Sequence, residues 1–94
     1  MRIVAGVKLS PQQADIFEEC CIDATLDELC EVFYSSKSRA YAANIIKVQI
    51  HQINGRLRET DWMICSDGKR PPTYRVVNVR VAANDNVGAL KRAA

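Results

Sequence analysis

Residues 38–58 read SRAYAANIIKVQIHQINGRLR. The apolar side chains of this stretch recur at steps of three and four, which places them on one face of an α-helix. They are Ala43, Ile46, Ile50, Ile53 and Leu57. The opposite arc carries mostly hydrogen-bond donors and no acid before Glu59: Asn44, Lys47, His51, Gln52, Asn54, Gly55 and Arg58. The pattern predicts a helix over about 39–59 that buries one stripe and presents a long cationic face, although most helices of this pattern are simply solvated on that face.

Two shorter helices are predicted before this stretch. Ser10-Pro11-Gln12-Gln13 is typical of a helix start, because serine caps the helix, proline suits its first position and Gln13 completes a capping box. Thr25 and Glu28 repeat the device. The helical spacing predicts these buried positions: Ala14, Phe17, Cys20 and Cys21 in the first helix, and Leu26, Leu29, Cys30 and Phe33 in the second. Residues 3–9 predict one or two small strands or an extended arm.

A β-hairpin is predicted after the long helix. Residues 62–65 read WMIC, which favours a strand, and Asp67-Gly68 is a strong hairpin-turn signal. The return strand is expected near Thr73, because Pro71 and Pro72 cannot donate to a ladder. The alternation of apolar side chains slips at residues 76–77, which predicts a bulge there or pairing with another strand, such as residues 3–9.

Three helices followed by a hairpin is the element order of a winged helix-turn-helix, an α+β fold in which the hairpin forms the wing. We therefore expect one domain over residues 1–81, with a recognition helix at about 39–59, a wing at 66–72 and a short N-terminal strand. Residues 82–94 read AANDNVGALKRAA, and this small and polar composition predicts a disordered tail.

The charged side chains are divided unevenly along the chain. Residues 1–36 hold two basic and seven acidic side chains, a net charge of −5, whereas residues 37–80 hold nine basic and three acidic ones, a net charge of +6. The overall charge of +2 by itself says nothing about nucleic acid, but this distribution would attract a polyanion to the second half.

Several classes of protein are disfavoured by composition. Without an apolar run approaching the ~20 residues of a membrane span, or a signal-like start, we expect a cytoplasmic protein that does not bind membranes. Cys20, Cys21, Cys30 and Cys65 fit neither metal-ligand spacing nor a disulfide framework, so no metal or cofactor is expected. With one histidine, no serine–histidine–acid grouping and no glycine-rich phosphate loop, we expect no enzyme activity.

Four segments follow the pattern of a known family. Residues 7–11, VKLSP, lead a strand into a helix that carries Phe17, and residues 25–29, TLDEL, open the second helix. Residues 46–57, IKVQIHQINGRL, match V-D-V-H-I-x-x-L-R-x-K-L at every apolar place, and residues 73–76, TYRV, are similar to G-Y-R-F. Over residues 7–77 the chain thus resembles the winged-helix effector domain of OmpR/PhoB-type response regulators. The resemblance implies a sequence-specific regulator of transcription that binds double-stranded DNA.

The chain departs from this family at the residues that would read DNA. Gln52 and Asn54 stand where the family usually has arginines, and Lys47 replaces an acid. Lys69-Arg70-Pro71-Pro72 stands in place of a compact R-G-x-G turn, so the family's base preference does not carry over. Because Ser10 already opens the first helix, we expect a stand-alone module without a receiver domain, nucleoid-associated when bound to DNA.

The expected DNA contacts follow from side-chain chemistry. The helix would lie in the major groove, where Gln52 and Asn54 pair with adenine, His51 donates to guanine and Lys47 reaches guanine or phosphate. Arg56 and Arg58 would contact the backbone, and the wing would contact the minor groove or its phosphates. Arg39 and the serine hydroxyls of residues 35–38 would meet a phosphate at the helix N-terminus. The candidate DNA-binding residues are Arg39, Asn44, Lys47, His51, Gln52, Asn54, Arg56, Arg58, Lys69 and Arg70.

An alternative is a winged helix that binds protein, as in a phage or mobile-element regulator that contacts a host protein. The docking face would be the acidic surface of the first two helices: Asp15, Glu18, Glu19, Asp27 and Glu31. Contact of this acidic half with RNA polymerase or another protein stays open, as does a homodimer on repeated half-sites.

Overall fold

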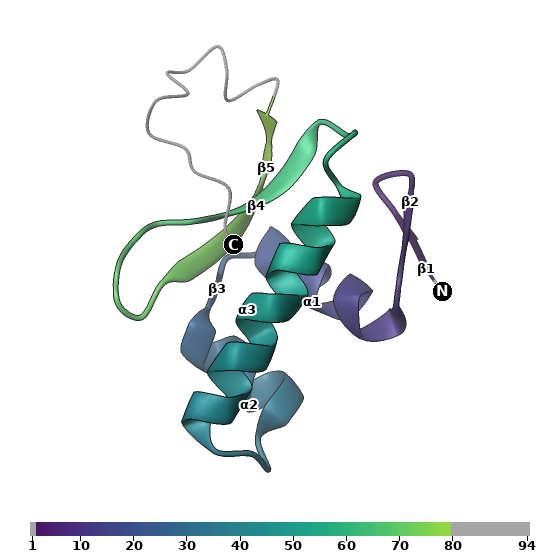
Figure 1. Cartoon of the computed structure of the whole chain (residues 1–94). Coiled ribbons are helices and arrows are strands. Elements are labelled where there is room, and N and C mark those ends of the chain that lie inside the picture. Colours follow the sequence, from purple (N-terminus) through teal and green to yellow (C-terminus); the bar gives the residue numbers. More distant parts are fainter. Residues whose placement is uncertain (1, 80–94) are drawn as a thin grey trace.

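The computed structural model describes residues 2–79, and the predicted tail at 82–94 lies outside them. The described residues form three helices, α1 (Pro11–Cys21), α2 (Leu26–Tyr34) and α3 (Arg39–Arg56), together with antiparallel strands. The strands are β1 (Arg2–Val4), β2 (Val7–Leu9), β3 (Ala24–Thr25), β4 (Trp62–Ser66) and β5 (Thr73–Asn78). The predicted α+β class is confirmed, and Figure 1 shows α3 as the longest element, with the β4–β5 hairpin following it.

The predicted helix starts are confirmed by their capping contacts. The Ser10 hydroxyl accepts from the Gln13 amide at 3.2 Å, and Thr25 accepts from the Glu28 amide at 3.1 Å, each within a complete capping box. Ser38 caps α3 by accepting from the Tyr41 amide at 3.2 Å. Each side chain thereby satisfies an amide that a helix N-terminus otherwise leaves without a partner.

The long helix ends three residues earlier than predicted, at Arg56 rather than 59. A turn follows, in which the Thr60 amide donates to the carbonyl of Leu57 at 2.9 Å. The Thr60 hydroxyl donates to the same carbonyl at 2.7 Å and accepts from the Trp62 amide at 3.1 Å. The hydrogen bonds of Thr60 therefore stabilise a turn that leads into β4, although the sequence pattern predicts helix up to residue 59.

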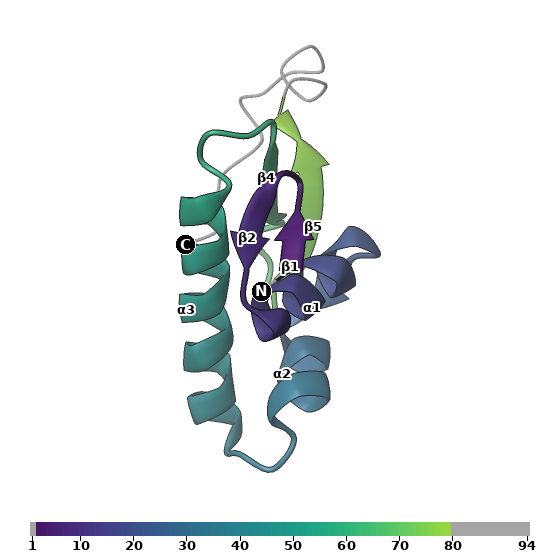
Figure 2. The same ribbon diagram turned by 90° about the vertical axis from the view of Figure 1, so that its right-hand side faces the viewer.

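The strands form two separate sheets. The first is the β1–β2 hairpin, which lies between α1 and α3 (Figure 2). In the second, β5 is the central strand between β3 and β4. The small strands predicted in residues 3–9 are confirmed, and they pair with each other. β5 does pair with another strand in addition to β4, but the suggested partner, residues 3–9, is wrong, because β3 takes that place opposite residues 73–74.

The predicted bulge at residues 76–77 is also wrong. The β4–β5 ladder runs without interruption from Trp62 opposite Asn78 to Ser66 opposite Tyr74. Residues 63–65 of β4 are all buried, so this strand is covered on both faces. In β5, Val76 and Val77 are both partly buried although they lie on opposite faces, so successive apolar side chains are accommodated there without a bulge.

The core is built around the predicted stripe of α3. Ile46, Ile50, Ile53 and Leu57 are at most 1% exposed, and they pack with buried residues of α1 and α2. At the start of α3, Ala42 is buried and Ala43 is only partly buried.

One predicted core position is wrong, and a second packs only at the edge of the core. Cys21 is exposed, because it is the last residue of α1, and Phe33 is only partly buried in the last turn of α2. Ile16 and Gln13 are buried in α1 although neither was predicted to be. The last residue of α1 and the last turn of α2 therefore cover less of the core than periodicity alone suggests.

Truncation of the core should reflect this difference in burial. Ile53→Ala is expected to lower the free energy of unfolding by about 2–5 kcal/mol, because it leaves a cavity in the α3 stripe. Phe33→Ala is expected to lower the free energy of unfolding by less than the same substitution would at a fully buried phenylalanine, because the Phe33 ring is partly solvated. Urea denaturation of both variants measures the two costs. A larger loss in Phe33→Ala than in Ile53→Ala would contradict the packing described.

Candidate nucleic-acid interface

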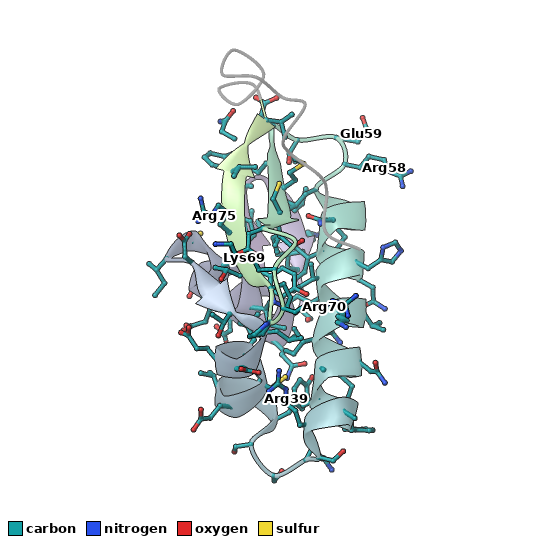
Figure 3. The ribbon with its side chains drawn as sticks, turned by 90° about the vertical axis from the view of Figure 1, so that its left-hand side faces the viewer. Arg39, Arg58, Glu59, Lys69, Arg70 and Arg75 are labelled. Atoms are coloured by element: carbon teal, nitrogen blue, oxygen red, sulfur yellow. The ribbon has the colours of Figure 1, made fainter. Side chains whose placement is uncertain are left out.

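A groove between the first half of α3 and the β4–β5 loop (residues 67–72) gathers most of the predicted cationic side chains. We call it the basic groove; it has a volume of about 780 Å³. Its lining residues are Leu26, Asp27, Arg39, Lys47, Ser66, Gly68, Lys69, Arg70, Pro71 and Pro72. Four of these are cations, and Asp27 is the acid among the described lining residues. Figure 3 shows Arg39, Lys69 and Arg70 on the same face of the molecule, beside α3.

The β4–β5 loop is a six-residue connection over residues 67–72, within the predicted wing at 66–72 and with the return strand starting at Thr73 as predicted. The carboxylate of Asp67 accepts from the amides of Lys69 at 2.9 Å and Thr73 at 3.1 Å, and these donors lower its pKa. Gly68 adopts a φ of +76°, a conformation that side-chain-bearing residues rarely take. The Leu26 amide donates to the carbonyl of Pro72 at 3.0 Å, which ties the loop to α2. Lys69 and Arg70 are thus exposed on a loop that is anchored at both ends.

Asn54 is not part of any exposed face, so its predicted contact with adenine is wrong. Its side chain is only 3% exposed. Its amide nitrogen donates to the carbonyl of Ile64 at 3.0 Å, and its amide oxygen accepts from the Ile64 N–H at 2.8 Å. The residue thereby pairs with the outer edge of β4 as a neighbouring strand would. The sequence carried a signal for this, since Asn54 follows Ile50 by four positions and precedes Leu57 by three.

Two predicted contacts lie on the side of α3 that faces α1 and β2, away from the basic groove. Gln52 is exposed, as expected, but its amide oxygen accepts from the side-chain nitrogen of Gln13 at 3.1 Å. The same nitrogen donates to Gln49 at 3.1 Å. The Arg56 guanidinium donates to the carbonyl of Lys8 at 3.4 Å. These two candidate residues therefore hold the helix against its neighbours.

The exposed outer ridge of α3 carries both predicted and unpredicted residues: Tyr41, Asn44, Lys47, Val48 and His51. Asn44 and His51 are exposed, as predicted. Tyr41 and Val48 are each 52% exposed on the same side, and neither is among the predicted contacts, which are all polar residues. Their spacing of seven residues from each other was the available signal. Arg58 is exposed beyond the end of α3 and lies next to Glu59 in Figure 3, at the far end of the helix from Arg39.

Much of the predicted acidic face is engaged with cations. Arg2 pairs with Asp15 at 2.6 Å and also with Glu18, and these partners raise its pKa. Arg39, expected to meet a phosphate, forms an ion pair with Asp27 of α2. Arg75 pairs with Asp23 at 3.2 Å and points away from α3 in Figure 3. The negative charge that was expected to form a docking face is therefore partly neutralised within the molecule.

Neither a metal-ligand cluster nor a membrane-spanning helix is found within residues 2–79. In residues 2–79, no three His, Cys, Asp or Glu side chains gather as ligands for a metal ion. Burial raises the pKa of the Cys20 thiol to about 12, which keeps it protonated and unreactive. No helix within these residues is long and apolar enough to cross a membrane. Comparison with protein-family models, curated proteins and solved structures finds no match, so the resemblance to response-regulator effector domains stays a hypothesis.

Proposed function

We propose that this chain is a winged helix-turn-helix regulator that binds double-stranded DNA sequence-specifically, with α3 as recognition helix and residues 66–72 as wing. The observation that carries the proposal is the basic groove. Arg39 and Lys47 come from α3, while Lys69 and Arg70 come from a loop more than 20 residues later, yet the four cations line one hollow. Cations gathered on one face are the electrostatic feature expected of a phosphate-binding surface.

The dimensions of α3 suit a major groove. Its 18 residues span about 27 Å at 1.5 Å per residue, and the groove of B-DNA admits one helix. In the proposed complex, the outer ridge faces the bases: Asn44 contacts adenine, His51 donates to guanine and Lys47 reaches guanine or phosphate. The basic groove then receives the phosphates of one strand, and Lys69 and Arg70 contact the adjacent minor groove or its backbone.

The ion pairs favour DNA over the alternative of a protein bound through the acidic face of α1 and α2. Asp15 and Glu18 share Arg2, and Asp27 is held by Arg39. A basic protein partner would have to compete with these internal cations. By contrast, Lys47, Lys69 and Arg70 are exposed residues that line one hollow.

Base reading should depend on Asn44 more than on Gln52. A bidentate contact between an amide side chain and adenine is worth about 1–3 kcal/mol of discrimination. After selection of bound sequences from random DNA, Asn44→Ala is expected to flatten the preference at one or two base pairs and to leave non-specific affinity nearly unchanged. Gln52→Ala is the matched control on the same helix, because the Gln52 oxygen is engaged by Gln13.

Two results would contradict this assignment. A uniform loss of affinity for all sequences in Asn44→Ala would show that Asn44 contacts the DNA backbone rather than a base edge. Failure of the selection to enrich any sequence, with no duplex binding even at low salt, would overturn the proposed function itself.

A further inference from the structure

One acid lies among the four cations of the basic groove. Asp27 is the second residue of α2, and its carboxylate forms an ion pair with the guanidinium of Arg39 at the first turn of α3. Both side chains are about half exposed, at 50% for Asp27 and 52% for Arg39, so the pair lies at the surface of the groove rather than in the core. No other described ion pair involves a residue that lines this groove.

A phosphate that enters the groove would meet this pair directly. It is attracted by Lys47, Lys69, Arg70 and Arg39, but it is repelled by the carboxylate of Asp27. Full contact with Arg39 requires the phosphate to replace Asp27 as its partner, and an exposed ion pair is weak enough for such an exchange. Every duplex loses binding free energy through this exchange, whatever its sequence.

We infer that Asp27, by holding Arg39, lowers the affinity of the basic groove for the phosphates of any DNA sequence. The inference rests on the proposed function and adds a repulsive element to it. Because phosphate contacts carry no sequence information, specific and random duplexes lose the same binding free energy to this ion pair.

Asp27→Asn tests this inference with a fluorescent duplex of random sequence, followed by anisotropy at low salt. The variant is expected to bind on the order of 3–10-fold more tightly, because one unit of repulsion beside the phosphate is removed. The slope of log affinity against log salt should also become steeper by about one unit, since the released Arg39 displaces a further counterion. Thermal melting checks that α2, which loses an acid from its first turn, stays folded.

Asp23→Asn is the matched control. It makes the same substitution and releases Arg75 from the same type of ion pair, but neither residue lines the basic groove. Its effect on duplex affinity is expected to be the small change that accompanies any increase of one unit in net charge. An equal gain in both variants would overturn the inference, because net charge alone would then explain it.

A double-mutant cycle with Arg39→Gln tests whether Asp27 acts through Arg39. Once Arg39 is neutral, Asp27→Asn should give a markedly smaller gain in affinity and no change in salt slope. An undiminished gain in that background would contradict the partner exchange. If the unaltered protein binds no duplex at all, the proposed function fails and this inference fails with it. If the unaltered protein binds and Asp27→Asn binds no better, the inference alone fails.

Discussion

Replacement of both Lys69 and Arg70 by glutamate is expected to weaken binding to any duplex, specific or random, on the order of 100-fold at low salt. The double variant removes two of the four cations that line the basic groove and puts two acids in their place. The change in affinity should be the same for all sequences, because phosphate contacts carry no sequence information. Fluorescence anisotropy with one selected and one random duplex measures both affinities.

The structure offers a suitable control for this double variant. Lys8 is an exposed cation on β2, outside the groove, and Lys8→Glu makes the same change in charge per residue. It is expected to weaken binding far less than Lys69→Glu alone. The fold should survive in all variants, because the loop is held by the Asp67 carboxylate and backbone amides rather than by the two replaced side chains. An equal loss in Lys8→Glu and Lys69→Glu would show that the loop makes no particular contact.

Asn54→Leu is expected to lower the free energy of unfolding by about 2–5 kcal/mol. The substitution approximately keeps the shape of the side chain but leaves the N–H and the carbonyl of Ile64 without the partners they have at 2.8 and 3.0 Å. Each buried backbone group that loses its partner costs about 1–3 kcal/mol. Because Ile64 is fully buried, water cannot replace the amide. Urea denaturation measures the loss.

Asn44→Leu provides the comparison, since it makes the same substitution on the exposed side of the same helix. Its effect on stability should stay within about 0.5 kcal/mol. Hydrogen exchange adds a local readout, because the Ile64 amide should lose protection in Asn54→Leu and keep it in Asn44→Leu. Equal stability of the two variants would contradict the description of Asn54 as a buried link between α3 and β4.

The local features of the fold could be predicted because they depend on neighbours in sequence. The capping boxes at Ser10 and Thr25 and the stripe from Ile46 to Leu57 follow from spacings of three and four residues, and all are confirmed. The strand limits near Trp62 and Thr73 are confirmed for the same reason. These signals act over one or two turns of chain, within the range at which side chains bias the backbone.

The remaining features depend on contacts between distant residues. Asn54 and Gln52 look alike in the sequence as polar residues of α3, but one lies against Ile64 and the other against Gln13. Likewise, β3 has only two residues and exists because β5 offers it an edge. The division of α3 into a groove side and an α1 side could not be predicted, because it is set by which elements pack beside the helix.

Amide chemical-shift mapping tests the proposed interface most directly. An isotope-labelled sample of the protein is titrated with a duplex that carries a selected site, and each backbone amide is followed. The predicted result is a set of shifts confined to the outer ridge of α3, around Asn44, Lys47 and His51, and to residues 67–72. Small or no shifts are expected in β1 and in the outward face of α1. Shifts centred on α1 and the β1–β2 hairpin, or no shifts at low salt, would contradict DNA binding through the basic groove.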